Sequence, residues 1–340
     1  MTPPPRETIR TLHPAYFAFV MATGIVSIAA ELLTIPYLPG FLLGINVAAY
    51  LALCGLTVIR VARYPRAVFD DLADHQRGVG FFTIVAATSV LGSQLVIVAK
   101  QQTFAFALWL LTLTLWLVLI YWVFTALTVK ETKPPLDEGI NGGWLVAVVA
   151  TQSVSTLASI ITPPSGMNAE TLLFISLAFW LAGGMLYIWL ISLIFYRYTF
   201  FRFAPSDLMP PYWINMGAMA ISTLAGTLLL ARTDASPLLA HLRPFTLGLT
   251  ILFWATATWW IPMLVILGFW RHVYKRFPLT YSPLYWGAVF PLGMYTACTY
   301  RLADVTTVKF LHTIPPLFIG IAVAAWSVTF FGLLRSLVRR

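Results

Sequence analysis

The chain has 340 residues, of which 59% are apolar and only 10% carry a charge. Soluble domains carry about 25% charged residues, so this composition excludes an ordinary soluble domain and indicates a polytopic protein of the lipid bilayer. The formal net charge of +9 does not indicate a nucleic-acid partner, because the basic residues gather in the connections between apolar segments, where they report membrane topology.

Ten apolar segments follow one another along the chain, and each is long enough to cross a hydrocarbon core of about 30 Å as a helix. The predicted helices span residues 14–34, 38–60, 79–99, 104–129, 143–162, 171–197, 212–231, 244–270, 283–302 and 310–334. The expected fold class is therefore all-α and integral to the membrane. We expect a cytoplasmic N-terminal segment (1–13), one ten-helix transmembrane domain (14–334) and a cytoplasmic basic tail (335–340).

Small and hydroxyl side chains dominate the odd-numbered helices, and bulky apolar and aromatic side chains dominate the even-numbered ones. The small-residue segments begin near Pro14, Val79, Gly143, Tyr212 and Ser282, so the pattern repeats about every 65 to 70 residues, the length of a helical hairpin with its loops. Bulky apolar side chains suit helices that face lipid, and small ones suit the centre of a bundle. The sequence therefore predicts five hairpins around an axis, with the odd helices as an inner ring and the even helices as an outer ring.

The small and polar residues of the inner ring are candidates for the lining of a central pore. Close packing of helices is the simpler explanation for each of them singly. Five helices that all lack bulk on a shared face would, however, leave an axial space whose polar groups could replace part of a solute's hydration shell. The predicted lining consists of Thr23, Gly24, Ser27, Thr88, Ser89, Thr151, Ser153, Ser155, Asn215, Gly217, Ser222, Thr223, Gly293 and Thr296.

Charged residues indicate the orientation of the chain and the sign of its solute. Sixteen of the 21 Lys and Arg residues fall on one side of the ten helices, which predicts that this side and both termini face the cytoplasm of a plasma-membrane protein. Lys100 and Arg301 fall on the other side, as the predicted charges of an outer vestibule. A cation pathway would be expected to show rings of Asp or Glu, and the middles of the inner helices contain no Asp, Glu, Lys, Arg or His. The expected solute is an anion or a neutral molecule.

One acidic cluster, formed by Asp70, Asp71 and Asp74, is the main candidate for enzymatic chemistry. Its spacing fits the carboxylates with which a membrane-embedded prenyltransferase holds Mg²⁺ and a diphosphate, and such an enzyme is the alternative function of a different class. A second carboxylate set with matching spacing is missing, and the two cysteines and five histidines form no metal-binding or catalytic motif. We therefore expect no catalytic residue, no metal site and no cofactor.

The ninth helix differs from the other inner helices because Pro291 lies inside it. Proline in a helix removes a backbone hydrogen bond and clashes with the preceding turn, so a kink is expected that would aim Phe290 differently from its neighbours. A flat ring on the axis would close the path as a hydrophobic constriction. Phe290 and Pro291 are therefore the predicted gate, and ordinary packing of Phe290 is the alternative.

Three segments resemble the tellurite-resistance/dicarboxylate transporter family, which includes malic acid transporters, TehA-like proteins and slow anion channels. These segments are His13 to Gly24, Pro211 to Ala218 and Tyr285 to Tyr300. The resemblance implies a homotrimer of separate pores, each gated by a phenylalanine that matches Phe290. It also implies transport of small anions, nominally C4-dicarboxylates such as malate, with inorganic anions such as sulfite, nitrate, chloride or tellurite-linked species as the alternative substrates.

Overall fold

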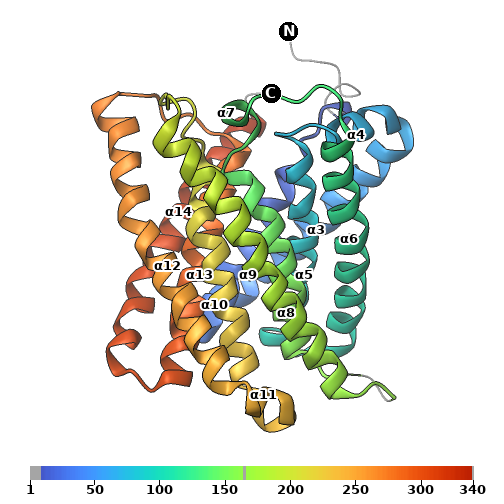
Figure 1. Ribbon diagram of the computed structural model, residues 1–340, viewed down its shortest axis with the longest axis vertical. Coiled ribbons are helices and arrows are strands. Elements are labelled where there is room, and N and C mark those ends of the chain that lie inside the picture. Colours follow the sequence, from blue (N-terminus) through green and yellow to red (C-terminus); the bar gives the residue numbers. More distant parts are fainter. Residues whose placement is uncertain (1–8, 164–165, 339–340) are drawn as a thin grey trace.

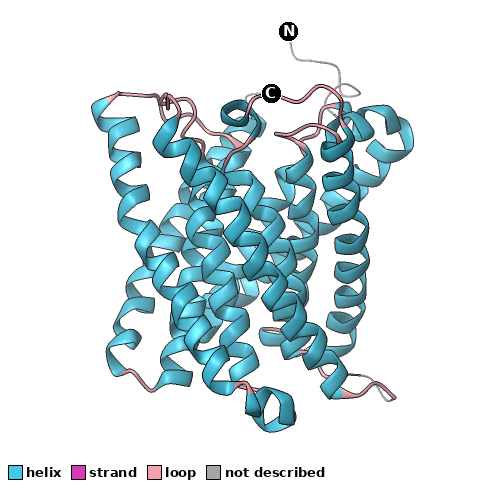
Figure 2. Cartoon of the chain, viewed as in Figure 1, coloured by secondary structure: helices cyan, strands magenta, loops and turns pink. Residues whose placement is uncertain are grey.

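The computed structural model describes residues 9–163 and 166–338, and all regular structure in these residues is helical. Helices run the length of the bundle and loops lie at its two ends (Figure 2). Residues 1–8 of the predicted N-terminal segment and residues 339–340 of the predicted tail lie outside the described residues. The prediction of an all-α membrane protein is confirmed.

Ten long helices alternate along the chain between an inner and an outer position (Figure 1). The inner five are α2 (Ala18–Leu32), α5 (Phe82–Ile97), α8 (Val146–Ile160), α10 (Ile214–Leu230) and α13 (Trp286–Thr306), and the outer five are α3 (Leu38–Arg63), α6 (Gln102–Val129), α9 (Ala169–Phe200), α12 (Arg243–Phe269) and α14 (Ile314–Val338). Nine of the ten segments that these helices form are apolar enough to cross a membrane. The exception is α13, which has 21 residues but carries Arg301 and Asp304 in its second half.

The inner helices form a closed ring in chain order. Each contacts the next, from α2 through α5, α8 and α10 to α13, and α13 returns to contact α2. Each outer helix packs on its own inner helix and also on the following one. In the inner spans other than α13, 72% to 83% of the most apolar stretch is buried, against 17% to 39% in the outer helices. Burial thus separates the two rings as the residue sizes predict.

Every inner helix begins with a 3-10 turn, and the five turns lie at the same end of the bundle. They are η1 (Pro14–Phe17), η2 (Gly78–Phe81), η3 (Gly142–Leu145), η4 (Pro210–Trp213) and η7 (Pro283–Tyr285). Each begins with Pro or Gly, and proline suits a first helical position because its missing N–H would have no partner there. Neighbouring turns contact each other around a complete circle. We call this the turn end of the bundle.

Aromatic side chains tie each outer helix to the inner helix of the next hairpin. Each of the five hydrogen bonds runs from an aromatic hydroxyl or indole N–H to an inner-ring oxygen, and the circle closes from α14 back to α2. The bonds are Tyr50 Oη to Thr88 Oγ1 (2.8 Å), Trp116 Nε1 to Thr151 Oγ1 (2.8 Å), Trp180 Nε1 to the Ser222 carbonyl (2.8 Å), Trp254 Nε1 to Thr299 Oγ1 (3.0 Å) and Trp326 Nε1 to Thr23 Oγ1 (2.9 Å).

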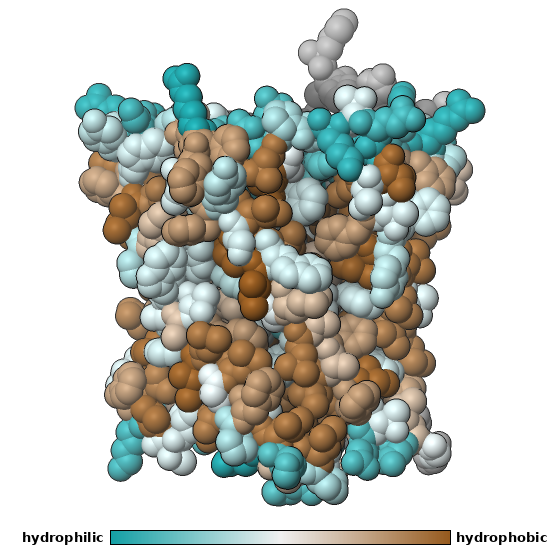
Figure 3. Space-filling view, viewed as in Figure 1, coloured by the Kyte–Doolittle hydropathy of each residue, from teal (hydrophilic) through white to brown (hydrophobic). Residues whose placement is uncertain are grey.

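Short helices lie outside the two rings, at the ends of the bundle. They are α4 (Pro65–Leu72), α7 (Leu136–Gly139), α11 (Pro237–His241), η5 (Thr233–Ala235) and η8 (Lys309–Thr313), and α12 continues into a π-helical turn, η6 (Trp270–Tyr274). Hydrophilic residues gather at the two ends, while apolar residues dominate the surface between them (Figure 3). This surface suits a protein whose outer helices face lipid.

Candidate functional site

A cavity of about 280 Å³ opens at the turn end on the axis of the inner ring. All five inner helices contribute to its wall, each through a residue near its start: Ala18, Thr83, Val146, Ile214 and Gly287. Because the five helices form a closed ring, a space that touches all of them lies at the ring's centre. We call it the wide cavity.

Phe290 lies at the deep side of the wide cavity. It is one helical turn beyond Gly287 on the same face of α13, lines the cavity and has no exposed surface. Pro291 follows inside α13, and α10 approaches it closely: a Cβ atom added to Gly217 would lie 2.7 Å from Pro291 Cγ. Glycine at position 217 therefore lets the two helices meet beside Phe290. The gating role of Phe290 stays a prediction.

A second and narrower cavity, of about 30 Å³, lies on the axis toward the other end of the bundle. Again all five inner helices line it, through Ile25, Val90, Thr156, Ile221 and Met294 among others. Met294 is one turn beyond Phe290 on α13, so along this helix the two cavities are separated by about one turn. The axis therefore runs from the wide cavity past Phe290 into this narrow cavity.

The two predicted vestibule charges differ in position. Arg301, on the last turns of α13, lines the narrow cavity. Lys100 is exposed and does not line it; its Nζ donates to the Ile97 carbonyl at the end of α5 (2.6 Å). Arg301 is thus the basic residue that the structure brings to the axis at this end.

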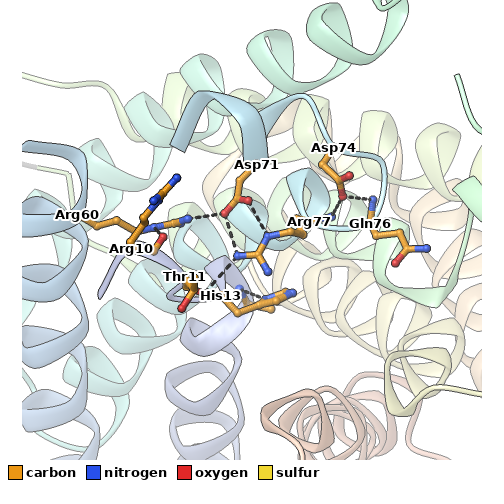
Figure 4. A network of polar contacts seen from close by, with 9 residues as sticks. Arg10, Thr11, His13, Arg60, Asp71, Asp74, Gln76 and Arg77 are labelled. Atoms are coloured by element: carbon orange, nitrogen blue, oxygen red, sulfur yellow. Dashed lines mark hydrogen bonds and ion pairs between the residues drawn. The ribbon is translucent and has the colours of Figure 1, made fainter. Parts of the chain in front are cut away.

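A charged network lies at the turn end and includes Arg77, which lines the wide cavity (Figure 4). The Asp71 carboxylate accepts hydrogen bonds from Arg60 Nη2 (2.6 Å), Arg77 Nε (2.6 Å) and Arg77 Nη2 (2.9 Å). Burial alone would raise the pKa of Asp71, but the hydrogen bonds and charges of the two arginines outweigh it and lower the pKa below its ordinary value. Arg77 also lines the wide cavity, so one cation of this network borders the axis.

Two polar residues that immediately precede inner helices also line the wide cavity. His13 Nδ1 accepts from the Ala15 amide (3.1 Å) and Asn141 Oδ1 accepts from the Gly143 amide (2.8 Å), so each caps a 3-10 turn. Burial, reinforced by the charge of Arg77, lowers the pKa of His13 to about 4, so its imidazole is neutral at pH 7. Sequence reasoning missed His13, Arg77 and Asn141. The sequence signal that could have identified His13 and Asn141 was a helix-capping residue directly before Pro or Gly.

The fourteen residues predicted to line the pore all contact their own or neighbouring helices, and their place along an open pathway stays a prediction. Among the described residues, none of the fourteen lines either axial cavity. Thr23, Thr88 and Thr151 face the aromatic donors of the outer ring, Ser27 donates to the Pro39 carbonyl, Ser89 to that of Ser153, Ser155 pairs with Ser176, and Asn215 donates to Tyr198 Oη. Ser153, Ser222, Thr223 and Thr296 donate to the carbonyl four residues earlier, and Gly24, Gly217 and Gly293 adjoin side chains of neighbouring helices.

The physical reason for these positions is the need of a buried hydroxyl for a partner. In an apolar interior a hydroxyl is satisfied by its own helix or by an aromatic N–H, and such partners hold the predicted hydroxyls. The lining of the two cavities combines apolar side chains such as Met21 and Met294 with the hydroxyl residues Thr83, Ser93 and Thr156.

The acidic cluster does not form a metal site within the described residues. Asp71 is shared by two arginines, and Asp74 Oδ1 accepts from the amides of Gln76 (2.9 Å) and Arg77 (2.8 Å). In the part of the chain that the structure describes, no group of three or more His, Cys, Asp or Glu could hold a metal ion. Asp71 and Asp74 instead hold Arg77, which lines the wide cavity.

Several membrane proteins are similar to this chain. An uncharacterized membrane protein of Mycobacterium tuberculosis strain H37Rv is 38% identical over 152 residues, which cover 45% of this chain and 77% of the relative. An uncharacterized transporter of Methanocaldococcus jannaschii is 27% identical and covers 86% of this chain and 85% of its own. A sulfite efflux pump of Arthroderma otae is 24% identical and covers 95% of this chain and 90% of its own. The family model described as voltage-dependent anion channel (SLAC1) matches residues 11–334, and the chain therefore belongs to this anion channel family.

Proposed function

We propose that the protein carries small anions across the membrane along the axis of the inner ring, from the wide cavity past Phe290 into the narrow cavity. One observation carries this proposal: both cavities are lined by all five inner helices, and the buried Phe290 lies on the side of the wide cavity that faces the narrow one. Displacement of its ring would open the wide cavity toward the narrow one, and hydrophobic constrictions of this kind gate by rotamer change or dewetting.

The charges along the axis support an anionic solute. Arg77 borders the wide cavity and Arg301 borders the narrow one. The five inner helices all begin at the turn end, so their positive dipole ends surround the wide cavity. No acidic side chain lines either cavity among the described residues. An anion therefore meets favourable potential at both ends.

Small inorganic anions are the substrates that the middle of the axis supports best. Between the two arginines the lining offers no fixed positive charge among the described residues: it combines apolar side chains such as Met21, Ile25 and Met294 with the hydroxyls of Thr83, Ser93 and Thr156. A C4-dicarboxylate such as malate carries two charges that are costly to dehydrate without fixed cations. A relative bears the name of a sulfite efflux pump, which also favours an inorganic oxyanion. Malate, the nominal substrate from the resemblance, is retained as the competing substrate.

We also propose a homotrimer in the plasma membrane, with the turn end and both termini in the cytoplasm. The excess of basic residues on that side supports the orientation, and the exposed aromatic surface of the outer helices permits contact between subunits. Crosslinking of the purified protein in mild detergent tests the trimer, and a product confined to monomers would contradict it.

Flux through proteoliposomes tests the pathway and its gate together. Chloride, nitrate, sulfite, malate and succinate are compared for wild type, Phe290→Ala and the control Phe174→Ala, which truncates a lipid-exposed ring on α9. If the Phe290 ring is the main barrier, its removal raises anion flux roughly tenfold or more, while Phe174→Ala leaves flux unchanged. Equal flux in wild type and Phe290→Ala would refute the gate, and no flux in either would refute the pathway.

A further inference from the structure

The side-chain amide of Asn141 lines the wide cavity and has an Nδ2 donor that no acceptor in the described part of the chain uses. Asn141 is 6% exposed and lines the cavity. Its Oδ1 is occupied by the Gly143 amide at 2.8 Å, whereas its Nδ2 donates to no acceptor among the described residues. Because Asn141 lines the cavity, its Nδ2 is free to donate to an acceptor that enters the cavity.

The surroundings of Asn141 favour a negatively charged acceptor. Asn141 is the N-cap of η3, which leads directly into α8, so the positive end of that long helix lies on the same side. Arg77 lines the same cavity, and its partner Asp71 is shared with Arg60, so these three side chains together carry one excess positive charge.

A second neutral donor lies at the same cavity. His13 Nδ1 accepts from the Ala15 amide, so the proton of the neutral imidazole resides on Nε2. His13 lines the wide cavity, and Nε2 has no acceptor among the described residues. The wall thus combines a guanidinium, an amide N–H₂ and an imidazole N–H, which suit an ion with several acceptor oxygens.

We propose that Asn141, Arg77 and His13 form a binding site for a small oxyanion in the wide cavity, where the ion is held before it reaches Phe290. As a step in transport this site rests on the proposed function, but the binding itself can be measured without any flux. Asn141 contributes to the affinity of this site through an amide N–H that has no acceptor among the described residues, as His13 does through Nε2.

Two substitutions of Asn141 remove its Nδ2 donor but keep an oxygen that can cap η3 in place of Oδ1. Asn141→Asp keeps Oδ1 for the Gly143 amide but replaces the N–H₂ donor by a negative charge, and Asn141→Ser keeps a capping oxygen, as Ser282 does for the Leu284 amide (3.3 Å). The matched control is Asn168→Asp. Asn168 Oδ1 caps α9 through the Glu170 amide (2.9 Å), away from the axis.

Nitrate binding is measured first, as the shift in unfolding temperature of each purified protein with nitrate concentration at constant ionic strength. Loss of one hydrogen bond to an anion should raise the half-saturating concentration roughly 10-fold to 100-fold for both Asn141 variants, and Asn168→Asp should match wild type. Nitrate flux is then measured in the Phe290→Ala background, where the Asn141 variants should show the same shift with a maximal flux changed by less than about twofold.

The outcomes separate the two proposals. Equal half-saturating nitrate concentrations for wild type and both Asn141 variants, or no nitrate-dependent stabilisation of wild type, would overturn the oxyanion site. Binding that depends on Asn141, together with no flux in any variant, would support the site and refute the transport pathway. An equal loss of binding in Asn168→Asp would assign the effect to added charge and overturn the role of Asn141.

Discussion

The hydrogen bond between Trp326 and Thr23 provides a test of how the two rings are joined. Trp326 Nε1 on α14 donates to Thr23 Oγ1 on α2 at 2.9 Å, and both residues are buried. We propose the double-mutant cycle of Thr23→Val and Trp326→Phe. Hydrogen bonds between membrane helices contribute about 0.6 kcal/mol on average and at most about 1.7 kcal/mol. Because the indole is buried and its geometry is good, we expect a coupling free energy of about 1 kcal/mol.

Each single variant should lose more unfolding free energy than the coupling free energy of the pair, and the two variants do so for different reasons. Thr23→Val leaves the indole N–H of Trp326 without an acceptor, which costs about 1 to 3 kcal/mol. Trp326→Phe removes the same donor and also leaves a void where the larger ring packed, for a loss of about 1 to 3 kcal/mol. Free energies of unfolding are measured by titration of the detergent-solubilised protein with SDS. Trp189→Phe, at an exposed indole on α9, replaces Trp326→Phe in the control cycle and should give a coupling near zero.

The same variants decide between two roles for Thr23. If its hydroxyl belongs to the joint between the rings, Thr23→Val lowers stability and leaves anion flux within about twofold of wild type. A coupling near zero together with a marked change in flux would refute this reasoning and would put the hydroxyl on the axis, as the small-residue pattern predicts.

Three further substitutions test the charged network, the far end of the axis and the layer around Phe290. Asp71→Asn leaves two arginines without their carboxylate and should cost roughly 1 to 3 kcal/mol at pH 7. Because the folded state lowers the pKa of Asp71, the stability that its carboxylate contributes is present above the unfolded pKa of about 4 and is lost as pH falls through the folded pKa. A loss of stability in Asp71→Asn that grows as the pH falls would contradict this. Abolished prenyl transfer with intact anion flux in the same variant would favour the enzyme. Arg301→Gln should reduce anion flux most at low ionic strength, because a charge at the mouth of the narrow cavity is screened over about 10 Å in 0.1 M salt; equal losses at every salt concentration would count against that role. Gly217→Ala should destabilise the fold by about 1 to 3 kcal/mol, since the added methyl meets Pro291 Cγ at 2.7 Å; an unchanged unfolding free energy would show that α10 and α13 separate freely.

The architecture was predictable because it repeats. Hydropathy alone misses α13, which carries Arg301 and Asp304, but the position of this helix in the fifth hairpin identifies it. Residue size also separated the rings correctly, since bulky side chains are excluded from a crowded centre. Neither argument depends on the rotation of a helix about its own axis.

The lining of the axis was not predictable, because it does depend on the rotation of each helix about its own axis. Thr88 and Thr151 lie on helices that are buried on nearly every side, so their spacing does not tell which face meets the centre. Their direction is set by aromatic donors on other helices, such as Trp116. Likewise, the grouping of Arg60, Asp71 and Arg77 depends on how loops of different hairpins pack, which no local pattern encodes.

The last link of the circle of aromatic hydrogen bonds has a consequence for how the chain is assembled during synthesis. The residues of the Trp326–Thr23 bond lie 303 positions apart. The Thr23 hydroxyl on α2 therefore gains this partner only after α14, the last long helix, has been inserted. Until then α2 has an uncovered side that no earlier hairpin supplies. A ribosome-bound chain that lacks the fifth hairpin is therefore an open arc, and the insertion of α13 and α14 is the step that converts it into a sealed, cooperative unit.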